Sequence, residues 1–267
     1  MWLGRQEEAF VGPSRTTPLR RIFALPQYPV RIGCASWNIP RLSAGDFVAR
    51  GSHLERYSQK LSCCEINSSF YCPHKNETWI RWAQSVPADF RFSVKMPKSI
   101  THVARLACSS DVLSAFLHQI AFLGEKLGPI LVQLPPSLEF EDSVTTNFLT
   151  LLRKSYSGEV VLEPRHLSWF NDRANDLLTA YQIARVAADP ACVPAAMDPG
   201  GSSSLAYFRL HGSPRRYYSP YSAEFLDQLF LTLQNLAATA RVWCVFDNTA
   251  SGSAIQNALA LKARLHQ

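Results

Sequence analysis

Eight short segments of the chain have the apolar or alternating pattern of β-strands, and they recur along almost its whole length. They are RIGCASW (31–37), CCEINSSFY (63–71), FRFSVKM (90–96), PILVQLP (129–135), EVVLEP (159–164), ARVAADP (184–190), LAYFRLHG (205–212) and RVWCVFDN (241–248). Most are separated by segments of helical periodicity, as where Leu226, Leu229 and Leu233 recur at steps of three and four residues. Residues 191–204 are the exception, because ACVPAAMDPGGSSS has the composition of a loop.

Eight alternating units in about 240 residues are typical of the (β/α)8 TIM barrel, which usually needs about 250 residues. The rival is an open doubly wound sheet, whose dinucleotide-binding version needs G-x-G-x-x-G after the first strand. Here that turn is CASWNIP. We therefore predict an α/β fold, a (β/α)8 TIM barrel that forms a single domain over residues 29–267. Residues 1–28, which contain several prolines, are predicted to be an N-terminal extension.

Composition narrows the functional classes. No apolar run approaches the roughly 20 residues of a membrane helix, and the N-terminus lacks the apolar stretch of a signal peptide. The seven cysteines are an odd set without a C-x-x-C pair, which indicates buried reduced thiols. We expect a cytoplasmic protein that does not enter a membrane. The net charge of +6 favours anionic ligands but is too small for a basic nucleic-acid-binding arm.

Residues two apart on a strand share a face, so polar side chains can be assigned to the barrel interior. Glu163 and Arg165 share one face, while Val160 and Leu162 share the other. The same test assigns further polar side chains to the interior: Glu65, Asn67, Arg91, Ser93, Lys95, Gln133, Asp189, Tyr207, Arg209, His211 and Asp247. Charges of both signs in one closed space are expected to pair, because burying any of them alone would cost several kcal/mol.

Polar residues at the C-terminal ends of several barrel strands indicate an active site. The predicted catalytic residues are Lys95, His102, Glu163, Arg165, Arg209 and His211. In this hypothesis the lysine and the two arginines stabilise negative charge, and the glutamate orients the substrate or accepts a proton. His211 or His102 is the acid–base group. A salt-bridge lattice that only fills the barrel is the open alternative.

A second set is predicted to bind substrate: Trp37, Glu65, Asn67, Tyr71, Gln133, His166, Trp169, Arg215, Arg216 and Asn248. The aromatic members would stack on a ring-containing ligand or else cap the barrel. A further hypothesis is an anion site at a helix N-terminus. In this hypothesis the hydroxyl-rich turn after the eighth strand faces Arg215 and Arg216, which follow the seventh strand. Solvated arginines and ordinary helix caps are the alternative.

No residue is assigned as a metal ligand, and the cofactor stays unknown. Four potential ligands of a divalent metal lie on successive strands: Glu163, Asp189, His211 and Asp247. Arg165 and Arg209, two residues from supposed ligands, would repel a metal and satisfy the carboxylates themselves. The expected partner is an anionic small molecule or a nucleic-acid fragment, and no protein partner is indicated.

The succession IGCASW, CEINSSFY, FRFSVKMPKSITH, LGPILVQLPPS, LEPRHLSW, YFRLHG and VFDNTASGSAIQNA resembles the family known as domain of unknown function 72, the YecE-like proteins. The resemblance covers about residues 31–265 and implies a TIM barrel without a settled reaction. Polar positions that recur in that family correspond here to Glu65, Asn67, Tyr71, Lys95, Thr101, His102, Gln133, Glu163, Arg165, His166, Trp169, Arg209, His211, Gly212 and Asn248.

The chain departs from the family pattern in two places. It has Ala35-Ser36-Trp37 where relatives usually end the first strand with Gly-Trp, and Asp247-Asn248 where they often have Asn-Asn. The second change adds a carboxylate at the mouth and weakens the case for an inherited anion site.

From the sequence we expect an enzyme with hydrolase or proton-transfer chemistry on a phosphorylated or anionic substrate at the C-terminal mouth of the barrel. Two alternatives remain: a non-catalytic nucleic-acid or metabolite binder, and a metal-dependent phosphoesterase or isomerase-like barrel.

Overall fold

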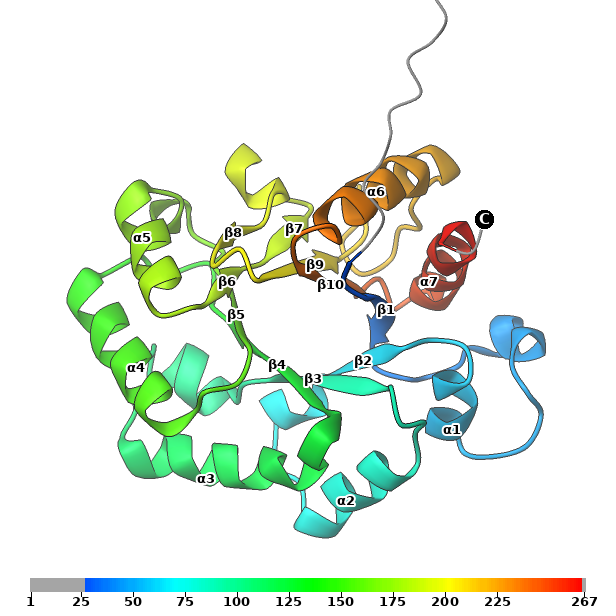
Figure 1. Cartoon of the computed structure of the whole chain (residues 1–267), viewed down its shortest axis with the longest axis horizontal. Coiled ribbons are helices and arrows are strands. Elements are labelled where there is room, and N and C mark those ends of the chain that lie inside the picture. The colour runs from blue at the N-terminus through cyan, green and yellow to red at the C-terminus, as the bar shows by residue number, and fades with distance from the viewer. Residues whose placement is uncertain (1–26, 266–267) are drawn as a thin grey trace, which may run out of the picture.

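The computed structural model describes residues 27–265 as a ring of strands surrounded by helices (Figure 1). The strands are β1 (Val30–Ala35), β2 (Cys63–Ile66), β3 (Arg91–Lys95), β4 (Leu127–Gln133), β5 (Val160–Glu163), β6 (Ala184–Arg185), β7 (Ala187–Asp189), β8 (Gly200–Gly201), β9 (Leu205–Leu210) and β10 (Arg241–Phe246). The α-helices are α1 (His53–Ser58), α2 (Asn76–Gln84), α3 (Ser110–Ile120), α4 (Asp142–Ser155), α5 (Asp172–Ala180), α6 (Ala223–Leu236) and α7 (Ser253–Arg264). Shorter 3₁₀ or π segments are η1 (Arg41–Asp46), η2 (Ser68–Phe70), η3 (Ser99–Val103), η4 (Ala121–Lys126), η5 (Leu167–Trp169) and η6 (Pro194–Met197).

Parallel pairing carries the sheet almost fully around the ring. Strands β1 to β5 pair in chain order, and β9, β10 and β1 form the opposite arc. The sixth barrel strand joins the arcs in two pieces, because β6 pairs with β5 whereas β7 pairs with β9. The two-residue β8 adds an antiparallel pair to β6. The predicted (β/α)8 TIM barrel is confirmed, with a nearly closed ring.

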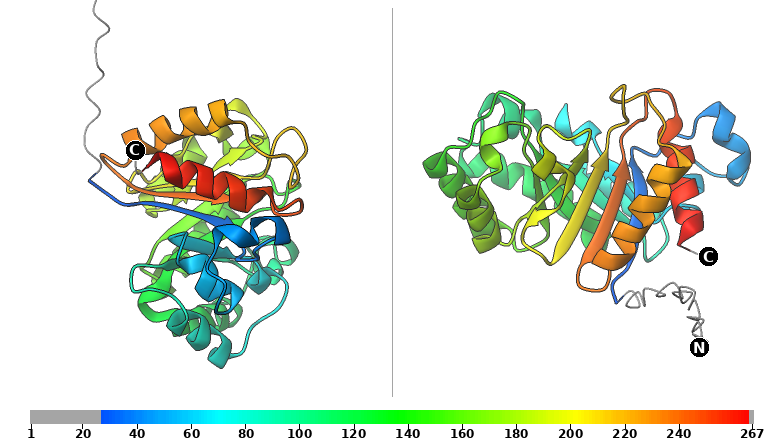
Figure 2. Two further views of the ribbon diagram at one scale, coloured as in Figure 1. Left: turned by 90° about the vertical axis from the view of Figure 1, so that its right-hand side faces the viewer. Right: turned by 90° about the horizontal axis from the view of Figure 1, so that it is seen from above.

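The outer face of the ring packs under the helices. Figure 2 shows β9 and β10 side by side along the barrel, with α6 and α7 against them. Helix α6 buries Leu226, Leu229 and Leu233, as their spacing predicted, and Ser222 caps it by accepting the Phe225 N–H. Between β7 and β9, the segment predicted to be a loop contains η6 and β8 but no α-helix. Within residues 27–265, no helix is both long and apolar enough to cross a membrane.

A smaller apolar layer fills the middle of the barrel. Its members come from strands all around the ring: Ala35, Cys63, Leu131, Val161, Ala184, Val186, Leu205, Tyr207, Trp243 and Val245. Polar side chains lie above and below this layer, at the two ends of the barrel interior. The apolar layer therefore separates two polar regions that are built from the same strands.

The prediction that Asp189 faces the barrel interior is wrong. Asp189 pairs in register with Leu210, which faces the helices, whereas Ala188 pairs with the inward Arg209. Adjacent strand residues point to opposite faces, so Asp189 follows Leu210 to the outside. There its Oδ1 accepts a hydrogen bond from the Tyr221 hydroxyl at 2.7 Å.

Most of the predicted N-terminal extension, residues 1–26, lies outside the described residues. Gln27 and Tyr28 donate their backbone N–H groups to the carbonyl of Ala237, just after α6, at 2.9 and 3.0 Å. The described chain therefore begins beside the C-terminal end of α6.

Candidate functional site

The guanidinium of Arg209, on β9, is fully buried at the C-terminal end of the barrel. It donates to both oxygens of Glu65 on β2, at 2.9 and 2.7 Å, to Glu163 on β5 at 2.6 Å, and to Asp247 after β10 at 3.0 Å. Burial alone would lower the pKa of Arg209, but Glu65, then Glu163 and Asp247, outweigh it and raise that pKa well above its ordinary value. One arginine thus links three strands across the barrel interior.

Glu163 collects further partners on the same side. It accepts hydrogen bonds from Gln133 Nε2 at 2.9 Å and from Arg165 Nε at 3.0 Å, and its Oε1 lies 3.0 Å from His211 Nε2. Burial would raise the pKa of Glu163, but Arg209, then Arg165 and His211, hold it well below the ordinary value. Glu163 is therefore ionised at neutral pH and can only accept hydrogen bonds.

His211 lies between two carboxylates directly after β9. Its Nδ1 is 2.9 Å from Asp247 Oδ2, while its Nε2 is close to both Glu163 Oε1 and, at 3.1 Å, Arg165 Nη2. A neutral ring that donates from Nδ1 to Asp247 can accept from Arg165 at Nε2, and a protonated ring can donate to both carboxylates. The ring is therefore held between Asp247 at Nδ1 and the Glu163–Arg165 pair at Nε2. We call Glu65, Gln133, Glu163, Arg165, Arg209, His211 and Asp247 the mouth cluster.

Two residues that the sequence analysis placed inside, but gave no role, support the mouth cluster from below. The Tyr207 hydroxyl lies 2.9 Å from Glu65 Oε2 and 2.9 Å from Ser93 Oγ. Its ring stacks on Trp243 of the apolar layer, with ring centres 5.9 Å apart. The alternation that assigned Arg209 to the interior also applies to Tyr207, two residues earlier, and was the available signal.

Lys95 lies at the rim of the mouth cluster and forms no salt bridge with a carboxylate of residues 27–265. Its Nζ is 4.1 Å from the centre of the Phe70 ring, and His102 contacts the same ring edge-on at 4.9 Å. Burial and Arg209 lower the pKa of Lys95 to about 8 against the opposing pull of Glu65. Burial, followed by Lys95, also lowers the pKa of His102.

The three aromatic candidates do not converge on the mouth cluster. Trp37 packs edge-on against Trp82, with ring centres 5.0 Å apart. Trp169 is buried and donates its Nε1–H to the carbonyl of Leu138 at 2.9 Å. Tyr71 is 79% exposed. Both tryptophans therefore serve packing, and Tyr71 presents its ring to solvent while it packs edge-on against Phe70, with ring centres 5.0 Å apart.

The remaining polar candidates are held by nearby loops. His166 Nδ1 lies 2.9 Å from Ser168 Oγ. Asn248 is buried and donates to the carbonyl of Ser219 at 2.9 Å, which ties the turn after β10 to the loop after β9. The Oδ1 atoms of Asn67 and Asn248 are buried and accept no hydrogen bond from the residues that the structure describes. These two buried acceptors and the unpaired ammonium of Lys95 leave polar capacity unused among the predicted residues that the structure describes.

Arg215 and Arg216 are exposed in the loop after β9, outside the mouth cluster. The guanidinium of Arg215 stacks on Tyr218, 3.9 Å from the ring centre. The turn after β10 is joined to this loop, because the Ala250 N–H donates to the carbonyl of Tyr217 at 3.1 Å. The two parts of the predicted anion site are adjacent, and neither arginine reaches Arg209 or its carboxylates.

The donors at the mouth do not fit a metal. Across residues 27–265, no group of three or more His, Cys, Asp or Glu side chains is arranged to hold a metal ion. Glu163 and Asp247 direct oxygens at Arg209, and Asp189, the remaining proposed carboxylate, lies on the outer face.

Comparison with known proteins places the chain in a family. The model of the family described as "Protein of unknown function DUF72" matches residues 31–267. This chain belongs to the DUF72 family. Its motif resemblance to that family is thereby confirmed.

Solved DUF72 structures share the fold. A DUF72 family protein of Thermotoga maritima MSB8 aligns with a TM-score of 0.74 at 26% identity, covering 89% of this chain and 99% of that one. A DUF72 family protein of Enterococcus faecalis V583 aligns with a TM-score of 0.76 at 22% identity, covering 90% and 96%. The UPF0759 protein YecE of Escherichia coli K12 is 33% identical over 107 residues, which are 40% of this chain and 38% of YecE. The match therefore spans less than two-fifths of that curated relative.

The mouth of this DUF72 barrel combines three chemical capacities. Lys95 and Arg165, whose side chain is 12% exposed, bring positive charge to the rim. Glu163 stays ionised, and the imidazole of His211 is an acid–base group whose Nε2 lies 3.0 Å from Glu163 Oε1. Anion binding and proton transfer are the chemistry that this arrangement supports.

Proposed function

We propose that this DUF72 protein is an enzyme that carries out proton transfer or hydrolysis on a phosphorylated or otherwise anionic substrate at the C-terminal mouth of the barrel. One observation carries the proposal: Lys95 is a rim cation without a carboxylate partner among residues 27–265, beside a cluster whose other charges are paired. A buried or half-buried charge without a partner is costly, and an anionic ligand would offset that cost.

The mouth residues take different roles in this proposal. Lys95 and Arg165 bind the anionic group, and Arg209 holds the carboxylates in position from beneath. Arg165 lies over His211 Nε2 at 3.1 Å. An anion that draws Arg165 toward the rim would uncover Nε2 for proton exchange with substrate. His102, at the rim beside Phe70, is the second acid–base candidate.

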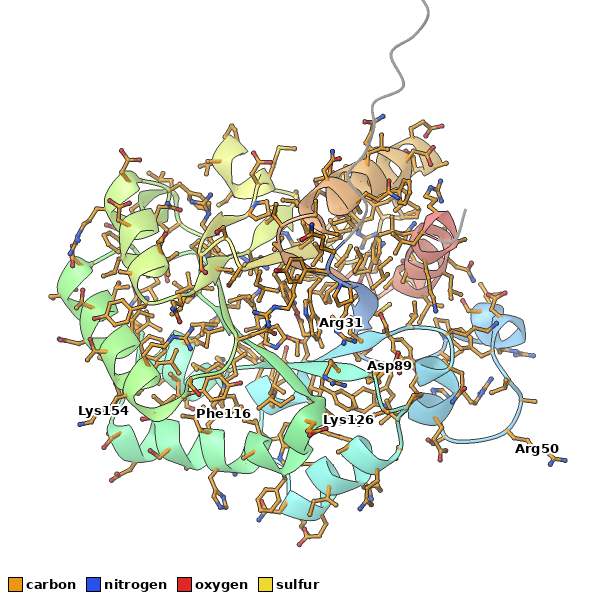
Figure 3. The ribbon with its side chains drawn as sticks, viewed as in Figure 1. Arg31, Arg50, Asp89, Phe116, Lys126 and Lys154 are labelled. Carbon is orange, nitrogen blue, oxygen red and sulfur yellow. The ribbon has the colours of Figure 1, made fainter. Side chains whose placement is uncertain are left out.

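The experiment is a thermal-shift screen of the purified protein with inorganic phosphate, sugar phosphates and nucleoside monophosphates, followed by turnover assays with any compound that binds. Lys95→Met is expected to weaken binding about tenfold or more, as loss of a charge-assisted contact does. His211→Asn is expected to leave binding intact and abolish turnover. Lys154→Met, which removes the same charge from an exposed residue on α4 (Figure 3), is the matched control.

The pH dependence provides an independent check. Lys95 has a pKa of about 8, so it is charged below that pH and neutral above it. Affinity for an anionic ligand is expected to fall as the pH rises through 8 in the wild type but not in Lys95→Met. Ligand binding that Lys95→Met leaves unchanged, or turnover that His211→Asn leaves unchanged, would refute the mouth as the site.

A second candidate function is the binding of single-stranded nucleic acid. The observation that favours it is the exposed Arg215–Tyr218 stack, with Tyr71 and Tyr217 also exposed in loops after the strands. Oligonucleotide binding that weakens steeply with salt and with Arg215→Ala, without turnover, would favour this function over the enzyme.

A further inference from the structure

The opposite, N-terminal end of the barrel contains a second polar region that differs from the mouth cluster. A cavity of about 200 Å³ opens there, lined by Pro29, Arg31, Arg91, Leu127, Gly128, Glu159, Arg241 and Trp243. These residues lie at or just before the N-terminal ends of β1, β3, β4, β5 and β10. We call this space the N-terminal cavity. The apolar layer of the barrel separates it from the mouth cluster.

Positive charge exceeds negative charge in the lining of the N-terminal cavity. It contains three arginines and one carboxylate, Glu159. Asp89 is close, but its contact with Arg31 is made by the backbone carbonyl, at 2.7 Å, and its side chain does not line the cavity. Figure 3 labels Arg31, Asp89 and Lys126. The net excess of two positive charges matches a doubly charged anion.

Backbone carbonyls hold the guanidinium groups of Arg31 and Arg91 in place but do not use all of their N–H donors. Arg31 Nη1 donates to the carbonyls of Asp89 and Ser62, and Arg91 Nη1 donates to those of Ala88 and Phe90 at 2.8 and 2.9 Å. Among residues 27–265, no acceptor is bonded to the other guanidinium nitrogens of these two arginines. A guanidinium has five N–H donors, so most of the donors remain available.

Glu159 has unused acceptor capacity. Its Oε1 lies 2.9 Å from Arg241 Nε, yet this buried oxygen accepts no hydrogen bond of good geometry from the described residues. Burial raises the pKa of Glu159, and Arg241 and Arg31 only partly oppose the increase. A ligand that fits this site would offer oxygen acceptors to the arginines and one hydrogen-bond donor to Glu159.

The floor of the cavity is rigid and apolar. The Trp243 ring is buried against Gly128, where a Cβ would lie 2.7 Å from the indole carbons. Glycine at this position therefore leaves room for the ring. The guanidinium of Arg31 lies 6.0 Å from the Trp243 ring centre. This floor excludes water from one side of the cavity and strengthens the electrostatic interactions of the arginines.

We propose that the N-terminal cavity binds hydrogen phosphate, a dianion that keeps one proton, between Arg31, Arg91 and Arg241. Guanidinium groups match the geometry of phosphate oxygens bidentately. Glu159 accepts the phosphate hydroxyl and so favours phosphate over sulfate, which has no proton to donate near neutral pH. The site is independent of the proposed reaction at the mouth.

The test is calorimetric titration of the full-length protein with inorganic phosphate and with sulfate at matched ionic strength. Phosphate is expected to bind, and sulfate to bind more weakly. Arg241→Gln is expected to weaken phosphate binding about tenfold, as loss of one charge-assisted contact does. Arg241 is 49% exposed, so this change does not threaten folding. Glu159→Gln, whose amide can donate to sulfate, is expected to remove the preference for phosphate.

Variants at the mouth separate the two sites. Arg50→Gln, an exposed arginine on another loop, is the charge-matched control and is expected to leave phosphate binding unchanged. In Lys95→Met, which removes the cation proposed to bind phosphate at the mouth, the binding event that Arg241→Gln weakens is expected to persist. Absence of phosphate binding at millimolar concentration would overturn the proposal. Phosphate binding that is lost in Lys95→Met but kept in Arg241→Gln would also overturn it, because the phosphate would then bind at the mouth. In that case the charge-retaining Arg91→Lys would keep phosphate binding as well.

Discussion

The two ends of the barrel interior use arginine in opposite ways. At the mouth, one fully buried arginine, Arg209, donates to three carboxylates. At the N-terminal end, three arginines line one cavity whose single carboxylate, Glu159, pairs with Arg241, while backbone carbonyls hold the other two. The first arrangement is nearly complete without a ligand, and the second has donors left over.

The difference indicates which parts of each region can respond to a ligand. Breaking a saturated buried network exposes charges that nothing else can satisfy, so Arg209 and its carboxylates are a fixed framework. Ligand binding at the mouth must then involve the rim, where Arg165 is partly exposed and Lys95 is buried without a carboxylate partner. At the N-terminal end the arginines themselves are available.

The largest expected effect comes from breaking the saturated end. Arg209→Gln is expected to reduce the free energy of unfolding by about 3–5 kcal/mol, because it leaves buried carboxylates without their cation. The same change at the other end, Arg241→Gln, is expected to cost about 1 kcal/mol or less, since its ion pair with Glu159 is half-exposed. Urea unfolding monitored by circular dichroism measures both. Equal losses would show that the two ends do not differ in the way described.

The glutamates at the two ends of β5 sharpen the comparison. Glu163→Gln is expected to lower stability at pH 7 by about 2 kcal/mol, because the amide cannot pair with Arg209 and Arg165. Glu159→Gln is expected to stay within about 0.5 kcal/mol of the wild type, since burial already disfavours its charge.

Acid titration of stability distinguishes the same pair. The pKa of folded Glu163 lies well below its ordinary value, so its contribution is present above the ordinary pKa and is lost as the pH falls through the folded value. The pKa of folded Glu159 is raised, so its ionisation costs stability above that pKa. Removing Glu163 should therefore make stability less sensitive to acid, and removing Glu159 should not. The opposite ranking would contradict the assignment of the ion pairs.

At Lys95 the expected effect on stability has the opposite sign. Its pKa of about 8 in the folded protein lies below the ordinary 10.5, so the charged lysine costs stability below pH 8. Lys95→Met is expected to raise the free energy of unfolding at pH 7 by about 1 kcal/mol. The difference should shrink as the pH rises from 8 toward 10.5. Lys154→Met, at an exposed position, should show neither effect, and a loss of stability in Lys95→Met would argue that the lysine is paired.

Strand alternation predicted which side chains share the interior, but it did not predict their height along the barrel. Arg91 and Lys95 lie on the same face of β3, yet they end at opposite ends of the barrel. Alternation therefore places Arg91 with the rest of the interior and gives Arg31 and Arg241 no separate position. Their separate grouping follows from strand register, which depends on pairing between distant segments.

The loops were the least predictable part of the site. Trp37 and Trp169 follow strands and were expected at the mouth, but both pack elsewhere. Residues beyond a strand no longer alternate between faces, so their direction is set by the local turn and by the helix that follows. His102 and Lys95 lie together because both contact Phe70, which comes from a different loop.

The sequence by itself determined the order of the eight barrel strands, most of their inner and outer faces and the family. These features are local, since a two-residue period and a three-to-four-residue period can be recognised within single segments. Only the tertiary structure decided that Arg209 meets three carboxylates while Arg31, Arg91 and Arg241 line a cavity with one. Hydrogen bonds between side chains on different strands depend on distances of a few ångströms, and those distances exist only once the ring of strands has formed.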